Sequence, residues 1–469
     1  MHAPAHQFIQ NKTFDEIAVG ASAELVRTLR PDDIHLFAAM SGDVNPTHVD
    51  PEFARSSQFR EVVGHSMWGS ALISSILGTE FPGPGTVYVS QTLGFHRPVG
   101  VGDTLTVKVT CKAKYAHNHH VVFDCLALNQ DGLKVIDGTA EVVAPTEKIK
   151  RPRISLPEVT ISDKELRYHH ILSLTTGLAP IPIAAVHPCD VESLRGALQA
   201  AEEGLIIPIL VGPEAKIRSV AEVEGFDLGN FRIVDVPHSH ASAEVAVAMA
   251  RKGEVEGLMK GSLHTDELMG AVVAREGLRT ARRISHVFLA EVPTYPRPLL
   301  ITDAAINIEP NLEDKVDIIQ NAIELAHMLG IPLPKVAILS ALETVTSKIH
   351  STIDAAALCK MADRGQIKGA LLDGPLAFDN AVSLVAAKTK GIRSAVAGQA
   401  DILVVPDLEA GNMVAKQLEY LADAVLAGVV LGARVPIVLT SRADTAETRA
   451  ASCAVVQLMA HKKREALGK

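Results

Sequence analysis

The stretch "MWGSALISSILGTEF" (67–81) is apolar around nearly its whole circumference when it is drawn as a helix. A helix of that kind is normally buried rather than laid on a protein surface. The segments that follow look like strands, and the short turns between them, such as "GVGD" and "QDG", favour antiparallel neighbours. These segments span residues 86–99, 104–116, 119–130 and 133–144. The pattern predicts an α+β domain over residues 1–145, in which an antiparallel meander of strands wraps around one helix.

A different pattern begins after a segment rich in proline and charge. Residues 146–164, which include "PRISLPEVT", show no periodicity, and this is typical of a linker. Beyond it, short apolar runs such as "IPIAAVHP", "PLLITDAAIN" and "ADILVVPD" alternate with helical patterns. That alternation predicts an α/β domain over residues 165–469 with a mostly parallel sheet. About 300 residues are better divided between two lobes than packed around one core.

The composition narrows the class of protein. A formal net charge of −9 and the lack of a long basic run argue against nucleic acid as the main partner, whereas a few local groups could still hold a small anion. The five cysteines are scattered, so we expect neither a disulfide framework nor a zinc site. The N-terminus lacks the order of a signal peptide, and the apolar run 424–433 is too short to span a bilayer. We therefore expect a cytoplasmic protein without a membrane partner.

The stretch "SGDVNPTHVD" (41–50) holds the first candidate site. A helix that ends at Gly42, followed by Pro46, turns the chain so that Asp43 and His48 could meet at one point. Such a carboxylate and imidazole can share one water, which the pair would deprotonate and orient. In the alternative interpretation Asp43 caps a turn and His48 packs on the surface, and this stretch alone favours that alternative. No strong third ligand for a metal presents itself.

Two segments of the α/β part carry chemistry suited to phosphate. "LMKGSLHTDE" (258–267) leads from a strand end through a Gly/Ser/Thr turn into a helix, and it could bind an anion through amides and Lys260, although such turns are common. "GLRTARRIS" (277–285) clusters three arginines, among them Arg279 and Arg282. Such a cluster is just as often a solvated face.

In a third segment, "VPIVLTSRADTAET" (435–448), Ser441 and Arg442 lie at the end of an apolar strand, and Asp444 follows two residues later. Ligands of open α/β sheets bind at the carboxyl ends of strands, which favours a site there. A helix cap at Ser441 and a surface arginine at position 442 explain the same residues equally well on local evidence.

Over residues 12–145 the segments "SGDVNPTHVD", "FREVVGHSMWGSALISSILG" and "PGPGTVYVSQTLGFHRPVGVGDTLTV" resemble the MaoC-like, R-specific enoyl-CoA hydratases, which have a hotdog fold. The resemblance implies that Asp43 and His48 activate water for addition to a trans-2-enoyl-CoA, which gives the (R)-3-hydroxyacyl-CoA. It also implies that a backbone amide at the start of the central helix holds the thioester carbonyl. Ser66 stands where the family commonly has glycine, so we expect this side chain to set which acyl chains are accepted. The implied substrate-binding residues are Asn45, Ser66 and Met67.

Residues 165–465 resemble the phosphate acetyl/butyryltransferase family in "KGSLHTDELMGAVVAREGLRT", "LLITDAAINIEPNLEDKVDIIQNA", "LLDGPLAFDNAVS", "ADILVVPDLEAGNMVAKQL" and "VLTSRADTAETRAAS". That family moves an acyl group between coenzyme A and inorganic phosphate without a metal or organic cofactor. Its second lobe is inserted in the first, which implies lobe I at about 165–304 and 431–469 and lobe II at about 305–430. The butyryltransferase branch is expected to be the nearer match.

The family's Ser–Arg pair matches Ser441, which would position the thiol, and Arg442, which would stabilise the oxyanion. Its catalytic aspartate comes later in the chain, so the base stays open, with Asp444 preferred and Glu447 second. An arginine that the acetyltransferases carry after the His–Thr turn is absent, and Arg279 or Arg282 could replace it. The implied substrate-binding residues of this part are Lys260, Ser262, His264, Thr265, Arg279 and Arg282.

The two resemblances predict a bifunctional enzyme with an α+β hotdog domain followed by a two-lobed α/β domain: an enoyl-CoA hydratase, which is a lyase, fused to a phosphate acyltransferase. In the alternative, the hydratase is active and the C-terminal domain is an acyl-CoA sensor and oligomerisation scaffold, because its motifs depart from the family near Ser441 and after His264. Both families pair subunits, so we expect a homodimer or a larger symmetric homo-oligomer. The sequence leaves open the acyl-chain preference of either site and any coupling between them.

Overall fold

The computed structural model describes residues 8–154, 159, 164–466 and 468. The chain divides into two compact units, Met1–Ile161 and Ser162–Lys469. The division lies inside the predicted linker 146–164, but the first part of that segment is a strand: β7 (Lys150–Pro152) pairs antiparallel with β1 (Phe8–Gln10). The first unit therefore extends beyond residue 145. Residues 155–158 and 160–163 of the predicted linker lie outside the described residues.

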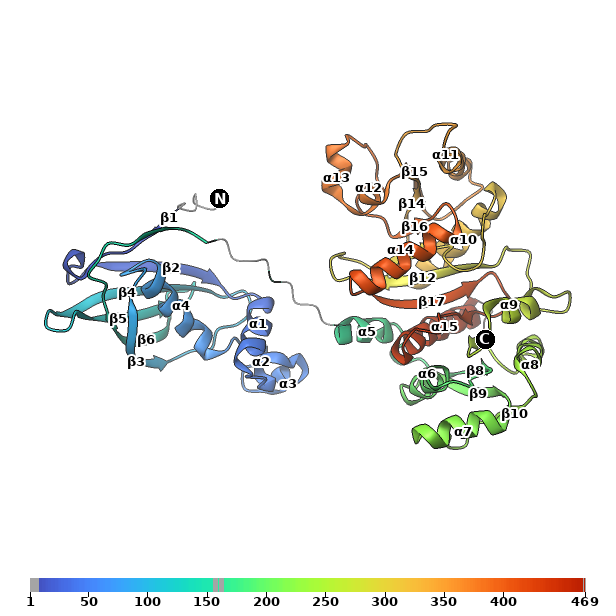
Figure 1. Cartoon of the computed structure of the whole chain (residues 1–469), viewed down its shortest axis with the longest axis horizontal. Helices are drawn as coiled ribbons and strands as arrows, with labels where there is room; N and C mark the ends of the chain where they lie inside the picture. Colours follow the sequence, from blue (N-terminus) through green and yellow to red (C-terminus); the bar gives the residue numbers. More distant parts are fainter. Residues whose placement is uncertain (1–7, 155–158, 160–163, 467, 469) are drawn as a thin grey trace. The chain divides into compact units, whose positions relative to one another are not determined.

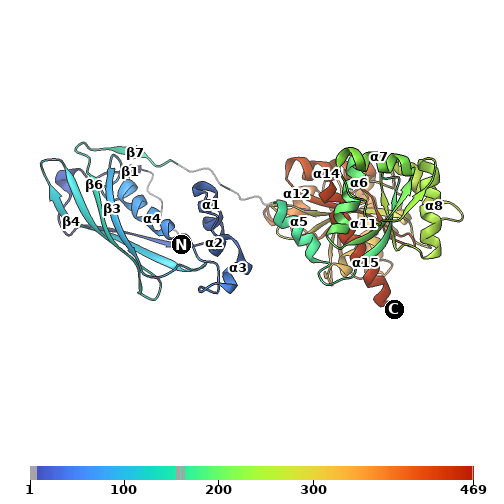
Figure 2. The same ribbon diagram turned by 90° about the horizontal axis from the view of Figure 1, so that it is seen from below.

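The first unit has a five-stranded antiparallel sheet that curves along helix α4 (Figures 1 and 2). The four strands predicted from the sequence are present, and an additional strand, β2, pairs with β4 at one edge. In spatial order the strands are β2 (Ser22–Thr28), β4 (Thr104–Tyr115), β5 (His120–Leu128), β6 (Lys134–Val143) and β3 (Val87–Phe95). This is the hotdog arrangement that the sequence predicts.

Helix α4 (Ser66–Thr79) buries one face and exposes another. Ile73, Ile76 and Leu77 are buried in a core shared with β4, β5 and β6. Met67 is 50% exposed, however, and Ser66 and Ser74 are exposed as well. The helix thus packs into the curved sheet as predicted, and the sheet covers one of its faces.

Short helices join β2 to α4. α1 (Pro31–Ser41) ends at Gly42, whose φ of 75° is the left-handed conformation in which glycine is least strained. α2 (Pro46–Val49) and α3 (Pro51–Ser56) follow directly, and each starts with a proline after an Asn or Asp cap. η1 (Phe14–Glu16) is a single turn near the start of the unit.

The second unit is built on one 11-stranded mixed sheet. Its two outer groups of strands are parallel, and the antiparallel pairs are those of β17 with β18, β17 with β12 and β12 with β13. In order the strands are β10 (Ile233–Asp235), β9 (Ile206–Gly212), β8 (Ile181–Val186), β11 (Gly257–Lys260), β18 (Ile437–Val438), β17 (Val425–Leu431), β12 (Ser285–Glu291), β13 (Leu299–Thr302), β16 (Ile402–Val404), β14 (Lys335–Leu339) and β15 (Leu371–Leu376).

Helices cover both faces of this sheet, as the near-continuous apolar strands predict. Along β8, Ile181, Ile183 and Ala185 pack into one core, while Ala184 and Val186 pack into another. The first core includes α6 (Val191–Glu202), α10 (Leu312–Met328), α11 (His350–Asp363) and α15 (Ala446–Ala466), and the second includes α8 (Ser239–Lys252) and α9 (Thr265–Val273). The remaining helices are α5 (Lys164–Ser173), α7 (Glu214–Glu224), α12 (Phe378–Val382), α13 (Leu384–Thr389) and α14 (Leu408–Leu421).

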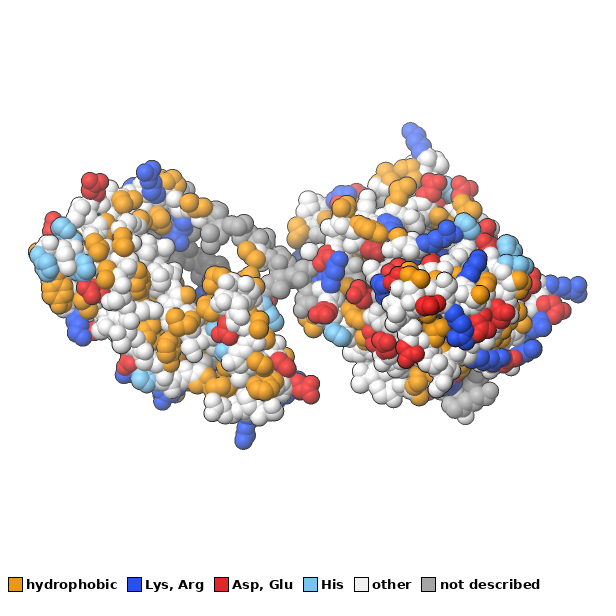
Figure 3. Space-filling view, turned by 60° about the horizontal axis from the view of Figure 1, so that its bottom comes forward, with side chains coloured by type: hydrophobic (Ala, Val, Ile, Leu, Met, Phe, Trp, Pro, Cys, Tyr) orange, Lys and Arg blue, Asp and Glu red, His pale blue; other side chains and the backbone are white. Residues whose placement is uncertain are grey.

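The strand order bears on the predicted lobes. β12 and β13 precede residue 305, yet they pair on the side of the sheet that holds β16, β14 and β15. The boundary of the inserted lobe near residue 305 stays a prediction. Within the described part of the chain, no helix has the length and apolar character needed to cross a membrane. On the face drawn in Figure 3, acidic and basic side chains of the second unit are interspersed.

Candidate active sites

Asp43 and His48 are brought together by the short helices after α1. Asn45 caps α2, since its side chain accepts hydrogen bonds from the backbone N–H and the hydroxyl of Thr47. The cap fixes the turn of α2 that carries His48, whose Nδ1 donates to the carbonyl oxygen of Val63 at 2.7 Å. A carbonyl only accepts, so Nδ1 holds the proton and Nε2 keeps a free lone pair. Asn45 is thus placed as a turn residue.

A third side chain, His65, joins this pair. It precedes α4 and is only 3% exposed, and its Nε2 donates to the backbone oxygen of Asp43 at 2.9 Å. Its ring lies 4.1 Å from that of His48, centroid to centroid. One ligand-type atom from each of Asp43, His48 and His65 lies within 4.8 Å of the others. The sequence interpretation assigned no role to His65, although its place directly before the apolar helix was visible.

The start of α4 offers hydrogen-bond donors close to these side chains. Ser66 and Met67 are the first two helical residues, and N–H groups at the first turn of a helix have no acceptor within the helix. They can therefore donate to an oxygen that gains negative charge. Both residues are exposed, as substrate access requires.

The candidate transferase residues lie at the carboxyl edge of two adjacent parallel strands. β11 pairs with β18 through Leu258 and Ile437, so Lys260 at the end of β11 and Ser441 just beyond β18 leave the sheet at the same edge. Ser441 is half-buried and Arg442 is exposed. Ser262 is tied to β8, because its hydroxyl donates to the carbonyl of His187 at 2.9 Å.

Asp444 is 2% exposed, and both of its carboxylate oxygens already accept hydrogen bonds. One accepts the backbone N–H of Ser441 at 2.7 Å, and the other accepts Nζ of Lys416 on α14 at 2.9 Å. Glu447 is exposed in the first turn of α15, where it lines a cavity of about 400 Å³ together with Tyr168 and Glu203. The two carboxylates considered as bases therefore have quite different surroundings.

Arg449 of α15 is the residue at this edge that the sequence interpretation missed. It is 1% exposed and donates to the carbonyl oxygens of Lys260 (3.3 Å) and Ser441 (3.0 Å) and to the hydroxyl of Thr440 (3.0 Å). Gly196 makes room for it, since a Cβ there would lie 2.7 Å from Cδ of Arg449. Arg449 thus fastens the end of β11 to the end of β18. An arginine in a helical pattern is ordinarily expected at the surface, which hid this role.

Arg279 and Arg282 are not brought to this edge, which corrects the prediction that they serve the Ser441 site. Arg279 forms an isolated bridge with Ala433, and the cavity of about 580 Å³ that Arg282 lines also includes Ala433. Ala433 precedes β18, whereas Ser441 follows it. The guanidinium of Arg282 is paired with Glu324 on α10 at 2.9 Å.

The second unit is similar to a known protein family. The profile described as "Phosphate acetyl/butaryl transferase" matches residues 239–456. A phosphate acetyltransferase of Rhizobium meliloti is 63% identical over 301 residues, which cover 64% of this chain and 95% of the relative. The chain belongs to the phosphate acetyl/butyryltransferase family.

Among its relatives, this family member does not lie nearest to the butyryltransferases. A phosphate butyryltransferase of Clostridium acetobutylicum is 42% identical over 275 residues, covering 58% of this chain and 91% of that protein. The acetyltransferase named above has the higher identity, so the expectation of a nearer butyryltransferase match is wrong.

The first unit of this transferase-family chain has its own match. The profile described as "MaoC like domain" covers residues 15–125. The solved R-hydratase PhaJ1 of Pseudomonas aeruginosa is 41% identical and covers 33% of this chain and 99% of its own, with a TM-score of 0.32. The two profile matches and the acetyltransferase relative show that the chain is an enzyme in which a MaoC-like unit and a phosphate acyltransferase unit are fused.

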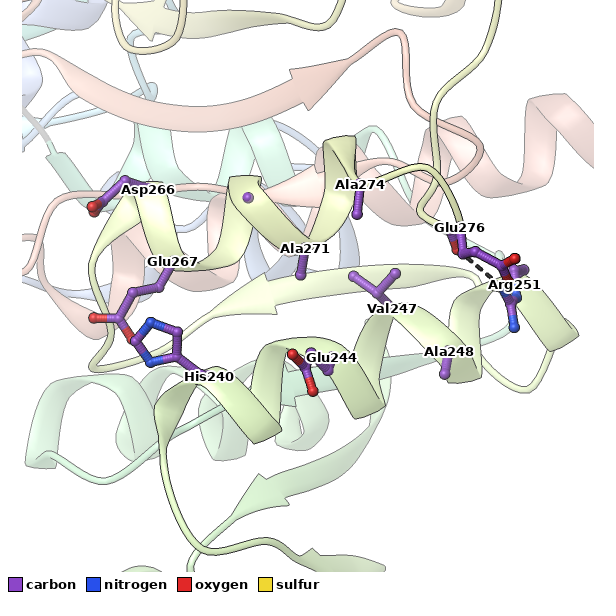
Figure 4. A pocket seen from close by; sticks show the side chains of 11 residues that line it. His240, Glu244, Val247, Ala248, Arg251, Asp266, Glu267, Ala271, Ala274 and Glu276 are labelled. Atoms are coloured by element: carbon purple, nitrogen blue, oxygen red, sulfur yellow. Dashed lines mark hydrogen bonds and ion pairs between the residues drawn. The ribbon is translucent and has the colours of Figure 1, made fainter.

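The helix that follows the transferase segment "KGSLHT" also borders an acidic groove. Between α8 and α9 a cavity of about 600 Å³ is lined by four carboxylates, those of Glu244, Asp266, Glu267 and Glu276. Figure 4 shows Glu267 facing His240, and Nδ1 of His240 lies 3.5 Å from Oε2 of Glu267. Carboxylates repel phosphate, so this groove is a poor phosphate site. His264 and Thr265, at the start of α9, precede the acidic residues.

Proposed function

We propose that the first unit hydrates trans-2-enoyl-CoA to (R)-3-hydroxyacyl-CoA. The observation that carries this proposal is the meeting of Asp43 with a His48 ring whose Nε2 is free to accept a proton. Water held between the two side chains would lose a proton to one of them, and the α-carbon of the substrate would gain one. The N–H groups of Ser66 and Met67 would stabilise the thioester oxygen as it becomes negative.

For the second unit we propose transfer of an acetyl- or butyryl-type acyl group between coenzyme A and phosphate. The observation that supports this proposal most is the shared edge of β11 and β18, where Arg449 holds the backbone of Lys260 next to that of Ser441, which precedes Arg442. The cations there suit a phosphate, and Arg442 can stabilise the tetrahedral oxyanion. Ser441 would position the thiol. Ser262, His264 and Thr265 would line the site that binds the anion.

The test is an activity profile of the full chain against acyl-CoAs of graded chain length. Loss of crotonyl-CoA absorbance would report hydration, and acyl phosphate formed from acyl-CoA and phosphate would report transfer. Hydration without acyl phosphate from any short acyl-CoA would instead support the sensor and scaffold alternative, which the occupied carboxylate of Asp444 favours. Light scattering would test the proposed homo-oligomer, and cell fractionation would test the proposed cytoplasmic location.

Neither reaction is proposed to need a metal or an organic cofactor. Asp43, His48 and His65 have the composition of a two-histidine, one-carboxylate metal site, so metal removal is the direct test. We expect incubation with EDTA, followed by desalting, to leave the rate of crotonyl-CoA hydration within about 20% of the untreated rate, since the pair already supplies the acid and the base. A loss that added Zn²⁺ restores would contradict this expectation.

A further inference from the structure

Two of the described lysines in the transferase unit are buried, and they differ in their partners. Lys315 on α10 is 5% exposed, and its Nζ lies 2.6 Å from the carboxylate of Asp354. Lys260 is 3% exposed, and among the residues that the structure describes no carboxylate lies within 4.0 Å of its Nζ. A buried ammonium without a counter-charge is unfavourable. Lys260 therefore either meets the charge of a ligand or gives up its proton.

The charged groups around Lys260 are two arginines and two aspartates, and they come from several elements. Burial, then Arg449 of α15 and Arg442 of the loop after β18, lower the pKa of Lys260 to about 8, while Asp190 and Asp444 oppose the shift. An amine with a pKa near neutral can both accept and release a proton during a reaction. The other titratable groups at this edge are His187 and Cys189 after β8, His264 before α9, and Lys416 on α14.

The carboxylates at this edge are poorly placed to take a proton from the thiol. Both oxygens of Asp444 are used by Ser441 and Lys416. Burial by itself would lower the pKa of Lys416, but its hydrogen bonds to Glu419 and Asp444 raise the pKa overall, so this lysine stays charged and holds Asp444. Glu447 is exposed on another cavity. Lys260, by contrast, is buried at this edge and has no carboxylate partner within 4.0 Å among the described residues, so its amine is available for this proton.

We propose that Lys260 shuttles the proton of the transferase reaction between the sulfur of coenzyme A and a phosphate oxygen. The inference rests on the proposed acyl transfer. Neutral Lys260 accepts the S–H proton as sulfur attacks the acyl phosphate carbonyl. The bond between the carbonyl carbon and sulfur forms. The bond between that carbon and the oxygen that bridges to phosphorus breaks, and Nζ gives the proton to the departing phosphate. In reverse, Nζ takes the proton of the attacking hydrogen phosphate and passes it to the departing thiolate.

Lys260→Arg separates proton transfer from charge. Arginine keeps a positive charge for phosphate but does not release its proton. We expect kcat to fall about 100-fold in both directions, because general acid–base catalysis typically contributes 10²- to 10⁴-fold, and KM for phosphate to change less than about threefold. In the wild type the rate should rise with pH through about 8, where Lys260 becomes neutral, and this rise should be absent in Lys260→Arg.

A second variant guards against a merely structural effect. Lys260→Ala should regain activity with added methylamine, which titrates, and not with guanidinium, which only carries charge. Lys360→Arg, at an exposed lysine paired with Asp363, is the matched control, and hydration by the first unit measures the amount of chain in every preparation. Full kcat and an unchanged pH profile in Lys260→Arg, or equal rescue by both cations, would overturn the shuttle. A wild type without any transfer would overturn the proposed function and the shuttle with it.

Discussion

Replacing Asp43 by asparagine is expected to lower the rate of crotonyl-CoA hydration by about 10³-fold or more and to leave acyl transfer unchanged. The amide keeps the size of the side chain but accepts no proton, so the water between Asp43 and His48 loses one of the two groups that activate it. His48→Ala should have an effect of the same order, because it removes the Nε2 that the bond from Nδ1 to Val63 leaves free. The double variant should be little slower than either single one, as is usual for residues that act as a unit.

The measurement is initial-rate spectrophotometry of crotonyl-CoA on the full-length chain. Two matched controls lie on α1: Asp32→Asn and His35→Ala change exposed residues of the same types in the same unit. Both should hydrate at the wild-type rate. Normal hydration by Asp43→Asn and His48→Ala together would show that this pair is not the catalytic one, whatever the fold of the unit.

Arg442→Ala is expected to lower kcat for acyl phosphate formation by about 10²- to 10³-fold, the usual effect of removing one oxyanion donor. Arg442 is exposed, and no carboxylate within the described residues forms an ion pair with it, so its guanidinium is available to a ligand. Lysine at this position should restore only part of the rate, because an ammonium lacks the planar fork of donors.

Arg434→Ala provides the control for this variant. Arg434 is also exposed, but it lies before β18 in the cavity that holds Arg282, at the other end of the strand from Ser441. We expect its transfer rate to match the wild type, and crotonyl-CoA hydration to be unchanged in both variants. Equal transfer by Arg442→Ala and wild type would remove Arg442 from the proposed mechanism.

Local sequence patterns were sufficient for the parts of the sites that depend on neighbours in the chain. Gly42 ends α1 and Pro46 starts α2, so the chain turns between these two residues and Asp43 and His48 lie on either side of the turn. The apolar run 67–81 and the strands after it predicted the first unit, and the alternation of apolar runs and helical patterns predicted the mostly parallel sheet of the second. In the same way, the apolar strand before Ser441 indicated a carboxyl edge.

Contacts between distant residues could not be predicted from spacing. Arg279 and Arg282 follow the segment of Lys260 closely in sequence, yet they lie at the other end of β18, because the chain first crosses α9. Lys416 meets Asp444 only because α14 packs beside the loop after β18. A pattern of residue types carries no information on which helix end will face which strand end.

The sequence by itself determined the two families and the order of the elements, and it placed Asp43 and His48 on either side of one turn, since all of these depend on residue types and their order along the chain. The tertiary structure alone decided that His65 holds the backbone of Asp43 and that Arg449 joins the ends of β11 and β18. It also decided that Lys260 is buried without a carboxylate partner among the described residues. The physical reason is that the protonation and role of a polar side chain depend on its burial and on the charges around it. Both are set by long-range packing rather than by its neighbours in the chain.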